Sequence, residues 1–345
     1  MFERLVGNHP AKAVLSRLVA AGRVPNALLL AGPDSVGKRQ FAFEIAAALV
    51  CKASDGTGPC GECSSCVRAS AFTYPKDDDR DGHLRVNFSE HPDIGIVLPH
   101  NRNILVEAIR DLEREANFLP FEAWARVFII DDADKLNDAA SNALLKTLEE
   151  PPPTSYLFLV SSRPDSLLLT IRSRCQTVRF SAVESSEIEL YLTDFMGMPK
   201  EDANLVAGSS NGGIGRALGL DTEKIRKLRD DMLTILTGTL LECDFAKVLQ
   251  SSDVMTDAKN KPDFEPSLQM LGSLIHDIWL LKNGAEIAGL VHQDMAGRLA
   301  DFSSSVTSVK LASWLSEIEE LRENLLVNIN RKVALDSMFV KIAGR

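Results

Sequence analysis

Residues 31–39 read Ala-Gly-Pro-Asp-Ser-Val-Gly-Lys-Arg, which is the pattern of a phosphate-binding loop in all but its last position. In such a loop, backbone N–H groups surround the phosphates, a lysine contacts the terminal phosphates, and a Ser or Thr hydroxyl binds magnesium. Gly32, Gly37 and Lys38 are in place, but Arg39 replaces the hydroxyl ligand. The sequence therefore predicts a degenerate nucleotide site, in which backbone amides and one ammonium can still hold phosphates.

Two carboxylates follow an apolar run at residues 127–130, where a nucleotide-binding fold places its magnesium-holding aspartate. Asp131 fits that role. Asp132 stands where a glutamate usually orients the attacking water, and its side chain is one methylene shorter, which weakens the alignment. Alternatively, the acidic cluster caps the next helix, with Asn137 or Asp138 as its N-cap. Both interpretations can hold together.

Four of the six cysteines lie close together, at positions 51, 60, 63 and 66. The spacing lets the thiolates of Cys51, Cys60, Cys63 and Cys66 converge on one tetrahedral zinc ion with no open coordination site. Such a site predicts a structural role, because a small knuckle without its own core depends on the metal for its fold. An iron–sulfur cluster and simple surface thiols are the alternatives. The other two cysteines are isolated, and we expect them to be buried: Cys175 and Cys243.

The first half of the chain alternates short β-like runs with helical patterns, which indicates a parallel sheet covered by helices on both faces. The runs are rich in β-branched, leucine or aromatic residues. We expect five strands at residues 27–31, 94–97, 127–130, 156–160 and 176–180. A helix from Lys38 to about Val50 delivers the chain into the cysteine knuckle. Residues 73–90 read as a loop, and the acidic run at 77–79 favours a hydrated surface over a metal site.

Composition sets the broad class of the protein. The 345 residues are 45% hydrophobic and 25% charged, which is typical of a soluble chain with two or three domains. Neither a signal pattern nor an apolar run long enough for a bilayer occurs, so we expect a cytoplasmic protein without membrane contact. The net charge of -10 argues against wholesale coating of nucleic acid.

Beyond residue 181 the strand signal ends and helical patterns take over. The sequence predicts a nucleotide-binding-like domain at 1–181 with the knuckle at 51–66 inserted, a small helical lid at 182–221, and an all-helical domain at 222–345. Within the last domain, residues 311, 314, 315 and 318 share one helix face, as do 335, 338, 339 and 342. These apolar stripes are most simply hydrophobic core.

Together these segments resemble the AAA+ clamp loaders of bacterial DNA replication, over nearly the whole chain. The strings that carry the resemblance are Val-Gly-Asn at 6–8, the cysteine knuckle, His-Pro-Asp at 91–93, Asp-Asp-Ala-Asp at 131–134, Ser-Asn-Ala-Leu-Leu-Lys-Thr-Leu-Glu-Glu-Pro-Pro at 141–152, and Ser-Arg-Cys at 173–175. The last two are the specific ones, since phosphate loops occur in many unrelated proteins.

The resemblance implies a P-loop AAA+ domain, a helical lid and a C-terminal collar. In this family motor subunits hydrolyse ATP, while another subunit typically does not and supplies its Ser-Arg-Cys arginine to a neighbour's site. Arg174 would be that arginine finger, although an arginine here can also be an ordinary surface ion pair. Arg39, the shortened Asp132, and Arg163 in place of a small sensor residue favour the non-hydrolysing kind, with ATP or ADP binding left open.

The family's second sensor arginine corresponds to Arg216, which can equally be an exposed helix residue. The implied partners are motor (gamma/tau) and delta subunits in a hetero-pentameric ring, and through the complex the sliding clamp and primer-template DNA. An active motor ATPase of the same ring is the main alternative function. The end of the chain at Arg345 counts against a long form of the motor subunit but not against a short form. A free-standing metal-binding or nucleotide-switch protein is the third.

Overall fold

The computed structural model describes residues 1–53, 58–76, 78–238, 252–253, 255–256, 264–324 and 330–343. Within these residues, no helix combines the length and apolar character that crossing a membrane requires. The chain divides into two compact units, one made of Met1–Ile188 with Gly212–Arg216 and the other of Glu189–Asn211 with Ala217–Arg345. The three-domain division at 181 and 221 stays a prediction.

The first unit is built on a six-stranded sheet in the order β2-β3-β4-β5-β1-β6. The strands are β1 Ala27–Ala31, β2 Asn87–Phe88, β3 Ile94–Val97, β4 Arg126–Ile130, β5 Ser155–Ser161 and β6 Gln176–Arg179. The five predicted strands are all present and pair in parallel. The predicted count of five was too low, because β2 lies inside the expected loop 73–90 and pairs antiparallel with β3. With two residues, β2 is too short for an alternating pattern to show.

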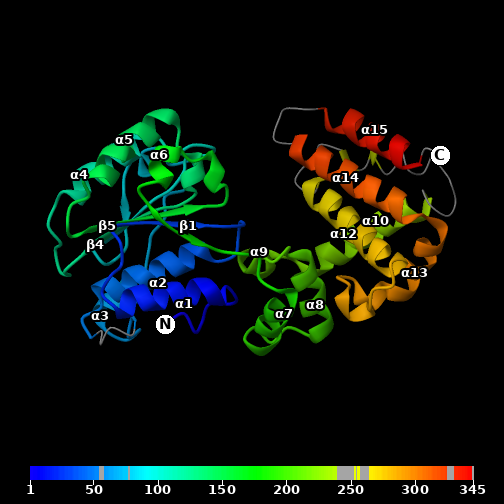
Figure 1. The fold of residues 1–345 in the computed structure, drawn as a ribbon, viewed down its shortest axis with the longest axis horizontal. Coiled ribbons are helices and arrows are strands. Elements are labelled where there is room, and N and C mark those ends of the chain that lie inside the picture. The colour runs from blue at the N-terminus through cyan, green and yellow to red at the C-terminus, as the bar shows by residue number, and fades with distance from the viewer. Residues whose placement is uncertain are drawn as a thin grey trace. The chain divides into compact units, whose positions relative to one another are not determined.

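Helices cover both faces of this sheet (Figure 1). The helices of the first unit are α1 His9–Ala20, α2 Lys38–Val50, α3 Ser64–Ala69, α4 Val106–Ala116, α5 Asp138–Glu149, α6 Leu169–Arg172 and the start of α9 Ile214–Gly219. Alternate strand residues enter two separate cores: Leu28 and Leu30 join α1 and α2, whereas Leu29 and Phe128 join α4 and α5. This alternation follows from the two-residue period of a strand, and a sheet buried on both faces explains the continuous apolar runs.

Local signals set the ends of two helices beside the site. Gly37 precedes α2 with φ +93°, a left-handed conformation that glycine adopts without a Cβ clash. Asn137 caps α5, since its side chain accepts a hydrogen bond from the Ala140 backbone N–H at 2.8 Å. Asn137 is therefore confirmed as the N-cap, and Pro151 and Pro152 follow the end of the helix at Glu149.

The strand register brings distant loops to one edge of the sheet. Ala31 pairs with Ser161, and Ile130 pairs with both Val97 and Leu159. The carboxyl ends of these parallel strands coincide, which is where open α/β sheets place their functional loops. The phosphate-type loop after β1, the aspartates after β4 and the segment after β5 consequently lie together.

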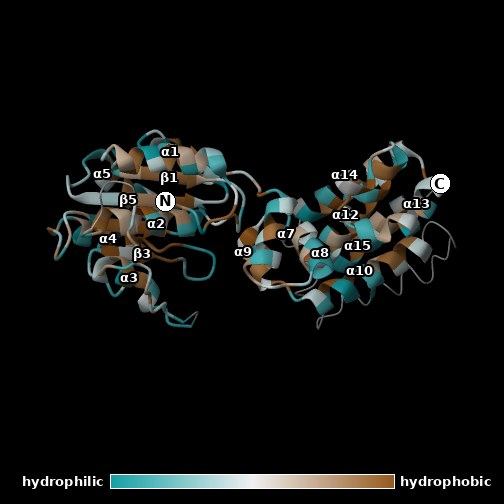
Figure 2. Ribbon diagram, turned by 90° about the horizontal axis from the view of Figure 1, so that it is seen from below, coloured by the Kyte–Doolittle hydropathy of each residue, from teal (hydrophilic) through white to brown (hydrophobic). Residues whose placement is uncertain are grey.

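The described residues of the second unit form helices joined by turns, and no strand occurs among them. Its helices are α7 Ser185–Asp194, which begins in the first unit, α8 Lys200–Ser209, α10 Thr222–Thr237, α12 Phe264–Lys282, α13 Ala296–Ser305, α14 Ser308–Asn324 and α15 Arg331–Ala343. Figure 2 shows apolar and polar residues alternating along them.

The two predicted stripes of this unit are buried as expected: Leu311, Trp314 and Ile318 on α14, and Leu335, Met338 and Phe339 on α15. Leu315 on α14 is half-buried. Cys243 and the side chain of Ile342 lie outside the described residues.

Candidate functional site

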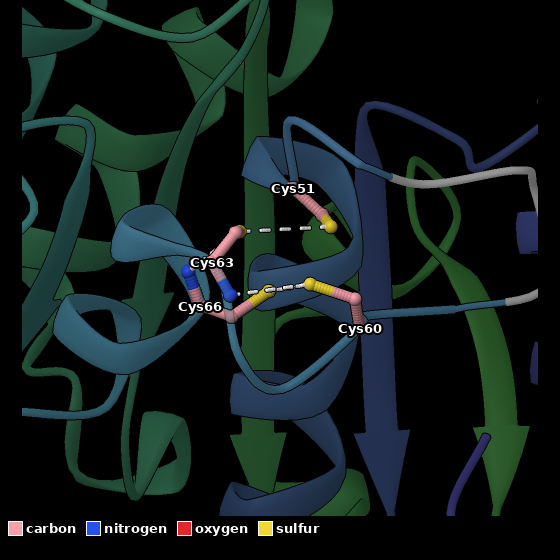
Figure 3. A group of neighbouring side chains, drawn as sticks. All are labelled: Cys51, Cys60, Cys63 and Cys66. Carbon is pink, nitrogen blue, oxygen red and sulfur yellow. Dashed lines mark hydrogen bonds between the residues drawn. The ribbon is translucent and has the colours of Figure 1, made fainter.

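The four cysteines converge at the end of α2 and the start of α3 (Figure 3). Their sulfur atoms all lie within 4.8 Å of one another. The Sγ atoms of Cys51 and Cys63 are 3.9 Å apart, as are those of Cys60 and Cys66. Zinc–sulfur bonds of about 2.3 Å at tetrahedral angles place sulfur atoms about 3.8 Å apart, so the cluster can bind a metal such as zinc.

Backbone N–H groups also turn toward these sulfurs. The N–H of Cys63 donates to Cys60 Sγ at 3.3 Å, and the N–H of Cys66 donates to Cys63 Sγ at 3.4 Å. Backbone donation from Cys66 and Lys52 lowers the pKa of Cys63 to about 6, whereas burial raises the pKa of Cys66. Donors of this kind stabilise thiolate, the form that binds a metal.

The phosphate-type loop after β1 is closed on itself. Gly32 allows a close approach, since a Cβ there would lie 2.3 Å from the Phe180 carbonyl oxygen. Lys38 is almost fully buried, and its Nζ donates to the carbonyl oxygens of Gly32, at 2.8 Å, and Pro33. Burial lowers the pKa of Lys38, an effect that the nearby carboxylate of Asp34 opposes. The ammonium that would contact phosphates is thus bound to its own loop.

Arg39, one residue further, reaches across to the end of β4. Its Nη1 lies 2.9 Å from Asp131 Oδ2, and the Asp131 side chain is only 12% exposed. Burial raises the pKa of Asp131, and the guanidinium of Arg39 acts against that rise. Arg39 also lies over the ring of Tyr74 at 6.0 Å. The guanidinium therefore contacts the carboxylate oxygen that the sequence assigned to magnesium.

The other two aspartates of this cluster are paired as well. Lys135 Nζ lies 2.8 Å from Asp132 Oδ2, and Asp132 itself adopts a left-handed conformation with φ +47°. The Arg163 guanidinium lies 3.2 Å from Asp134 Oδ2.

Asp134 also accepts hydrogen bonds from the Ser161 hydroxyl and the Ser162 backbone N–H. Burial of Asp134 acts to raise its pKa, but these donors and Arg163 hold that pKa below its ordinary value. Each carboxylate of the cluster consequently has its own cation.

The segment that precedes Arg216 contacts the phosphate-type loop. The Gly215 backbone N–H donates to the Ser35 carbonyl oxygen at 2.8 Å, and a Cβ on Gly215 would lie 3.2 Å from the same oxygen. Arg216 follows directly in α9 and is half-buried. The structure therefore brings this arginine's backbone beside the loop.

Arg174 lies between α6 and β6. Its partners are residues outside the aspartate cluster. Its Nη2 donates to Glu149 Oε1 at 2.7 Å, and its Nη1 donates to the Thr170 carbonyl oxygen at 2.9 Å. The Arg174 side chain is 34% exposed. Cys175 is half-buried, and burial raises its pKa to about 12.

Two family models match the chain across both units. The model described as DNA polymerase III, delta subunit, matches residues 7–78 and 74–184, and the model described as DNA polymerase III, delta subunit, C terminal, matches residues 227–343. The chain belongs to the DNA polymerase III delta subunit family. The matched ranges of this family include the phosphate-type loop, the cysteine cluster and Arg174.

The chain is also similar to individual proteins. The chain is 27% identical to DNA polymerase III subunit delta' of Escherichia coli (strain K12), over 99% of this chain and 92% of that protein. It is 28% identical to subunit tau of Bacillus subtilis (strain 168), over 72% of this chain but only 43% of that protein. A gamma subunit-related protein of Thermotoga maritima has 18% identity and a TM-score of 0.44, over 96% of this chain and 99% of that structure.

For this delta subunit family member, sequence reasoning found the residues but not their partners. It singled out Arg39, Asp131 and Arg163, yet gave no sign of the pairs that they form. Glu149, the acceptor for Arg174, lies in the string at 141–152 that carries the resemblance, but the sequence analysis gave it no role. A carboxylate in the last turn of a helix, where the helix dipole disfavours negative charge, was a second local signal that could have drawn attention to Glu149. Asp78 and Asp79 are exposed, and Asp77 lies outside the described residues.

Proposed function

We propose that this chain is the delta prime subunit of a bacterial DNA polymerase III clamp loader, that it does not hydrolyse ATP, and that it supplies Arg174 to a neighbouring ATPase subunit. One observation carries the absence of hydrolysis: the Arg39 guanidinium lies 2.9 Å from Asp131. Positive charge is thus supplied to that carboxylate by the chain itself, where an active site uses magnesium. Membership in the delta subunit family and the similarity to delta' over 99% of this chain support the assignment as the delta prime subunit.

The paired aspartates explain why hydrolysis would fail. Phosphoryl transfer depends on magnesium to neutralise developing charge and on a carboxylate or amide to orient the nucleophile. Arg39 competes with the metal for Asp131, and Lys135 holds the shorter Asp132 at 2.8 Å. Phosphates entering the loop would also have to draw Lys38 away from its backbone acceptors.

Arg174 is the residue that we propose acts in trans. A guanidinium presents several N–H groups in a planar fork that matches a phosphate. Arg174 is partly exposed beside the edge strand β6, and its carboxylate partner Glu149 is 52% exposed. It would donate to the charge that develops on the γ-phosphate bound by the neighbour, a contribution worth roughly a thousandfold or more in turnover where such a finger operates.

The remaining assignments follow the family. We propose a hetero-pentameric ring with gamma/tau and delta subunits, joined through the region 222–345, with 182–221 as the lid. The ring would load the sliding clamp onto primer-template DNA in the cytoplasm. Arg216 would act as the second sensor, because its neighbour Gly215 donates to the phosphate-type loop.

For the cysteine cluster we propose one structural zinc ion held by Cys51, Cys60, Cys63 and Cys66. The sulfur separations of 3.9 Å suit a single ion, since a cluster of several iron atoms is wider than one metal ion. Four protein ligands would fill the coordination sphere, so the ion would stabilise the knuckle and bind no substrate.

The test is reconstitution of the clamp loader with Arg174→Ala and measurement of DNA-stimulated ATP hydrolysis. Arg172→Ala is the matched control, because Arg172 is a neighbouring arginine that pairs at 2.9 Å with the exposed Asp165. We expect a large loss of turnover with Arg174→Ala and little change with Arg172→Ala. Equal turnover in both complexes would remove the trans role.

An active motor ATPase is the alternative that one comparison favours, namely the 28% identity to tau over 72% of the chain. The discriminating measurement is magnesium-dependent hydrolysis in a complex where this subunit alone keeps its loop lysine, Lys38. Hydrolysis there above the level of a Lys38→Ala complex would establish the motor function.

A further inference from the structure

The guanidinium of Arg174 is held from two sides. Glu149 Oε1 accepts from Nη2 at 2.7 Å, and the Thr170 carbonyl oxygen accepts from Nη1 at 2.9 Å. The first acceptor lies at the end of α5 and the second within α6, so two separate elements fix the direction of one side chain. Because the guanidinium has further N–H groups, it can keep both bonds and still donate to an anion.

Glu149 is poorly explained by the stability of its own helix. It is the last residue of α5, where the carbonyl end of the helix dipole disfavours a carboxylate. Lys146 stands three residues earlier and would be a suitable partner, but its Nζ lies 2.9 Å from Glu113. The ion pair with Arg174 is thus the interaction that Glu149 makes at this position.

The same pair contributes little to folding. Both side chains are partly exposed, Arg174 by 34% and Glu149 by 52%, and exposed ion pairs stabilise proteins weakly. The pair does restrict a long side chain that would otherwise sample many rotamers in solvent. Its principal effect is therefore on where the guanidinium lies.

We propose that Glu149 is a positioning residue that orients Arg174 before it meets the phosphate of a neighbouring subunit's nucleotide. This inference rests on the proposed trans role of Arg174. Glu149 itself contacts no substrate. It lowers the entropy lost when Arg174 donates to the transferring phosphoryl group, since the side chain is already ordered.

The test is the reconstituted clamp loader carrying Glu149→Gln, with Glu150→Gln as matched control, because Glu150 is the adjacent exposed glutamate that follows α5. We expect Glu149→Gln to lower kcat for DNA-stimulated ATP hydrolysis about fivefold to tenfold, the cost of ordering one long side chain. KM for ATP and the thermal unfolding midpoint of the free subunit stay unchanged. Combined with Arg174→Ala, Glu149→Gln has no additional effect, because no guanidinium remains to be oriented.

Three results would overturn the inference while leaving the trans role intact. They are a kcat of Glu149→Gln equal to that of Glu150→Gln, a rise in kcat, and an additive loss in the double variant, each with Arg174→Ala still impaired. An unimpaired Arg174→Ala complex would instead remove the proposed function itself. The two failures are distinguishable in one set of measurements.

Discussion

Replacing Arg39 by threonine should restore what the phosphate-type loop lacks. The substitution supplies a hydroxyl at the position of the magnesium ligand and removes the guanidinium that lies 2.9 Å from Asp131. Asp131 is left as a nearly buried carboxylate beside Asp132, with its compensating charge gone. We expect the variant to be less stable without magnesium and nucleotide, and to gain stability when both are added.

The size of the loss follows from the geometry of the pair. Unit charges about 4 Å apart attract by about 4 kcal/mol at an effective dielectric constant of about 20. The Arg39 side chain is 41% exposed, so solvent screening reduces this to about 2 kcal/mol. That estimate lies between the values for fully exposed pairs, about 0–1 kcal/mol, and for breaking buried pairs, about 3–5 kcal/mol.

Urea unfolding of the isolated subunit at neutral pH measures both effects. Arg39→Thr should lower the free energy of unfolding by about 2 kcal/mol. Arg39→Lys, which keeps a positive charge, should lower it by less. A ligand that binds the folded state and is present at about one hundred times its dissociation constant raises the free energy of unfolding by about 2.7 kcal/mol. Magnesium with ATP should therefore stabilise the threonine variant and leave the natural chain unchanged. If the variant matches the natural chain in urea, or if both respond equally to ligand, Arg39 does not substitute for the metal.

Three further predictions concern other parts of the chain. Metal analysis should find one zinc per chain and none in a variant with both Cys60→Ser and Cys63→Ser. Trypsin should cut the knuckle of this variant faster than that of the natural chain. Equal zinc content in the two proteins would exclude the site. Asn137→Ala should cost about 1 kcal/mol in urea by removing the cap of α5, and a loss near zero would contradict the capping role. Burial lowers the pKa of His292 from 6.5 to about 4, so the folded state binds this proton less readily than the unfolded state. The free energy of unfolding should be highest above pH 6.5 and fall by about 3 kcal/mol as the pH drops to 4. His292→Gln should make this fall smaller, and an equal fall in the variant would contradict the prediction.

The elements of the first unit could be read from the sequence because their signals are local. The strand at Ala27–Ala31 and the helix at Lys38–Val50 have the predicted bounds. A short apolar run and a helical pattern that follows a glycine both depend only on neighbouring residues. The cysteine cluster was equally predictable, because its four cysteines lie within sixteen residues and the spacing limits how they can meet. β2 was missed, since its two residues acquire strand geometry only by pairing with β3.

The chemistry of the candidate site was decided by the tertiary structure. The sequence identified Arg39 as a missing metal ligand, but residues 39 and 131 become an ion pair only because β1 and β4 end at the same edge of the sheet. Arg163 and Asp134 meet for the same reason, and Arg174 meets Glu149 because α5 packs against α6. Periodicity and capping depend on residues a few positions apart, whereas an ion pair depends on the distance between atoms that folding brings together. The sequence could therefore name the charged residues, and only the fold determined which charge faces which.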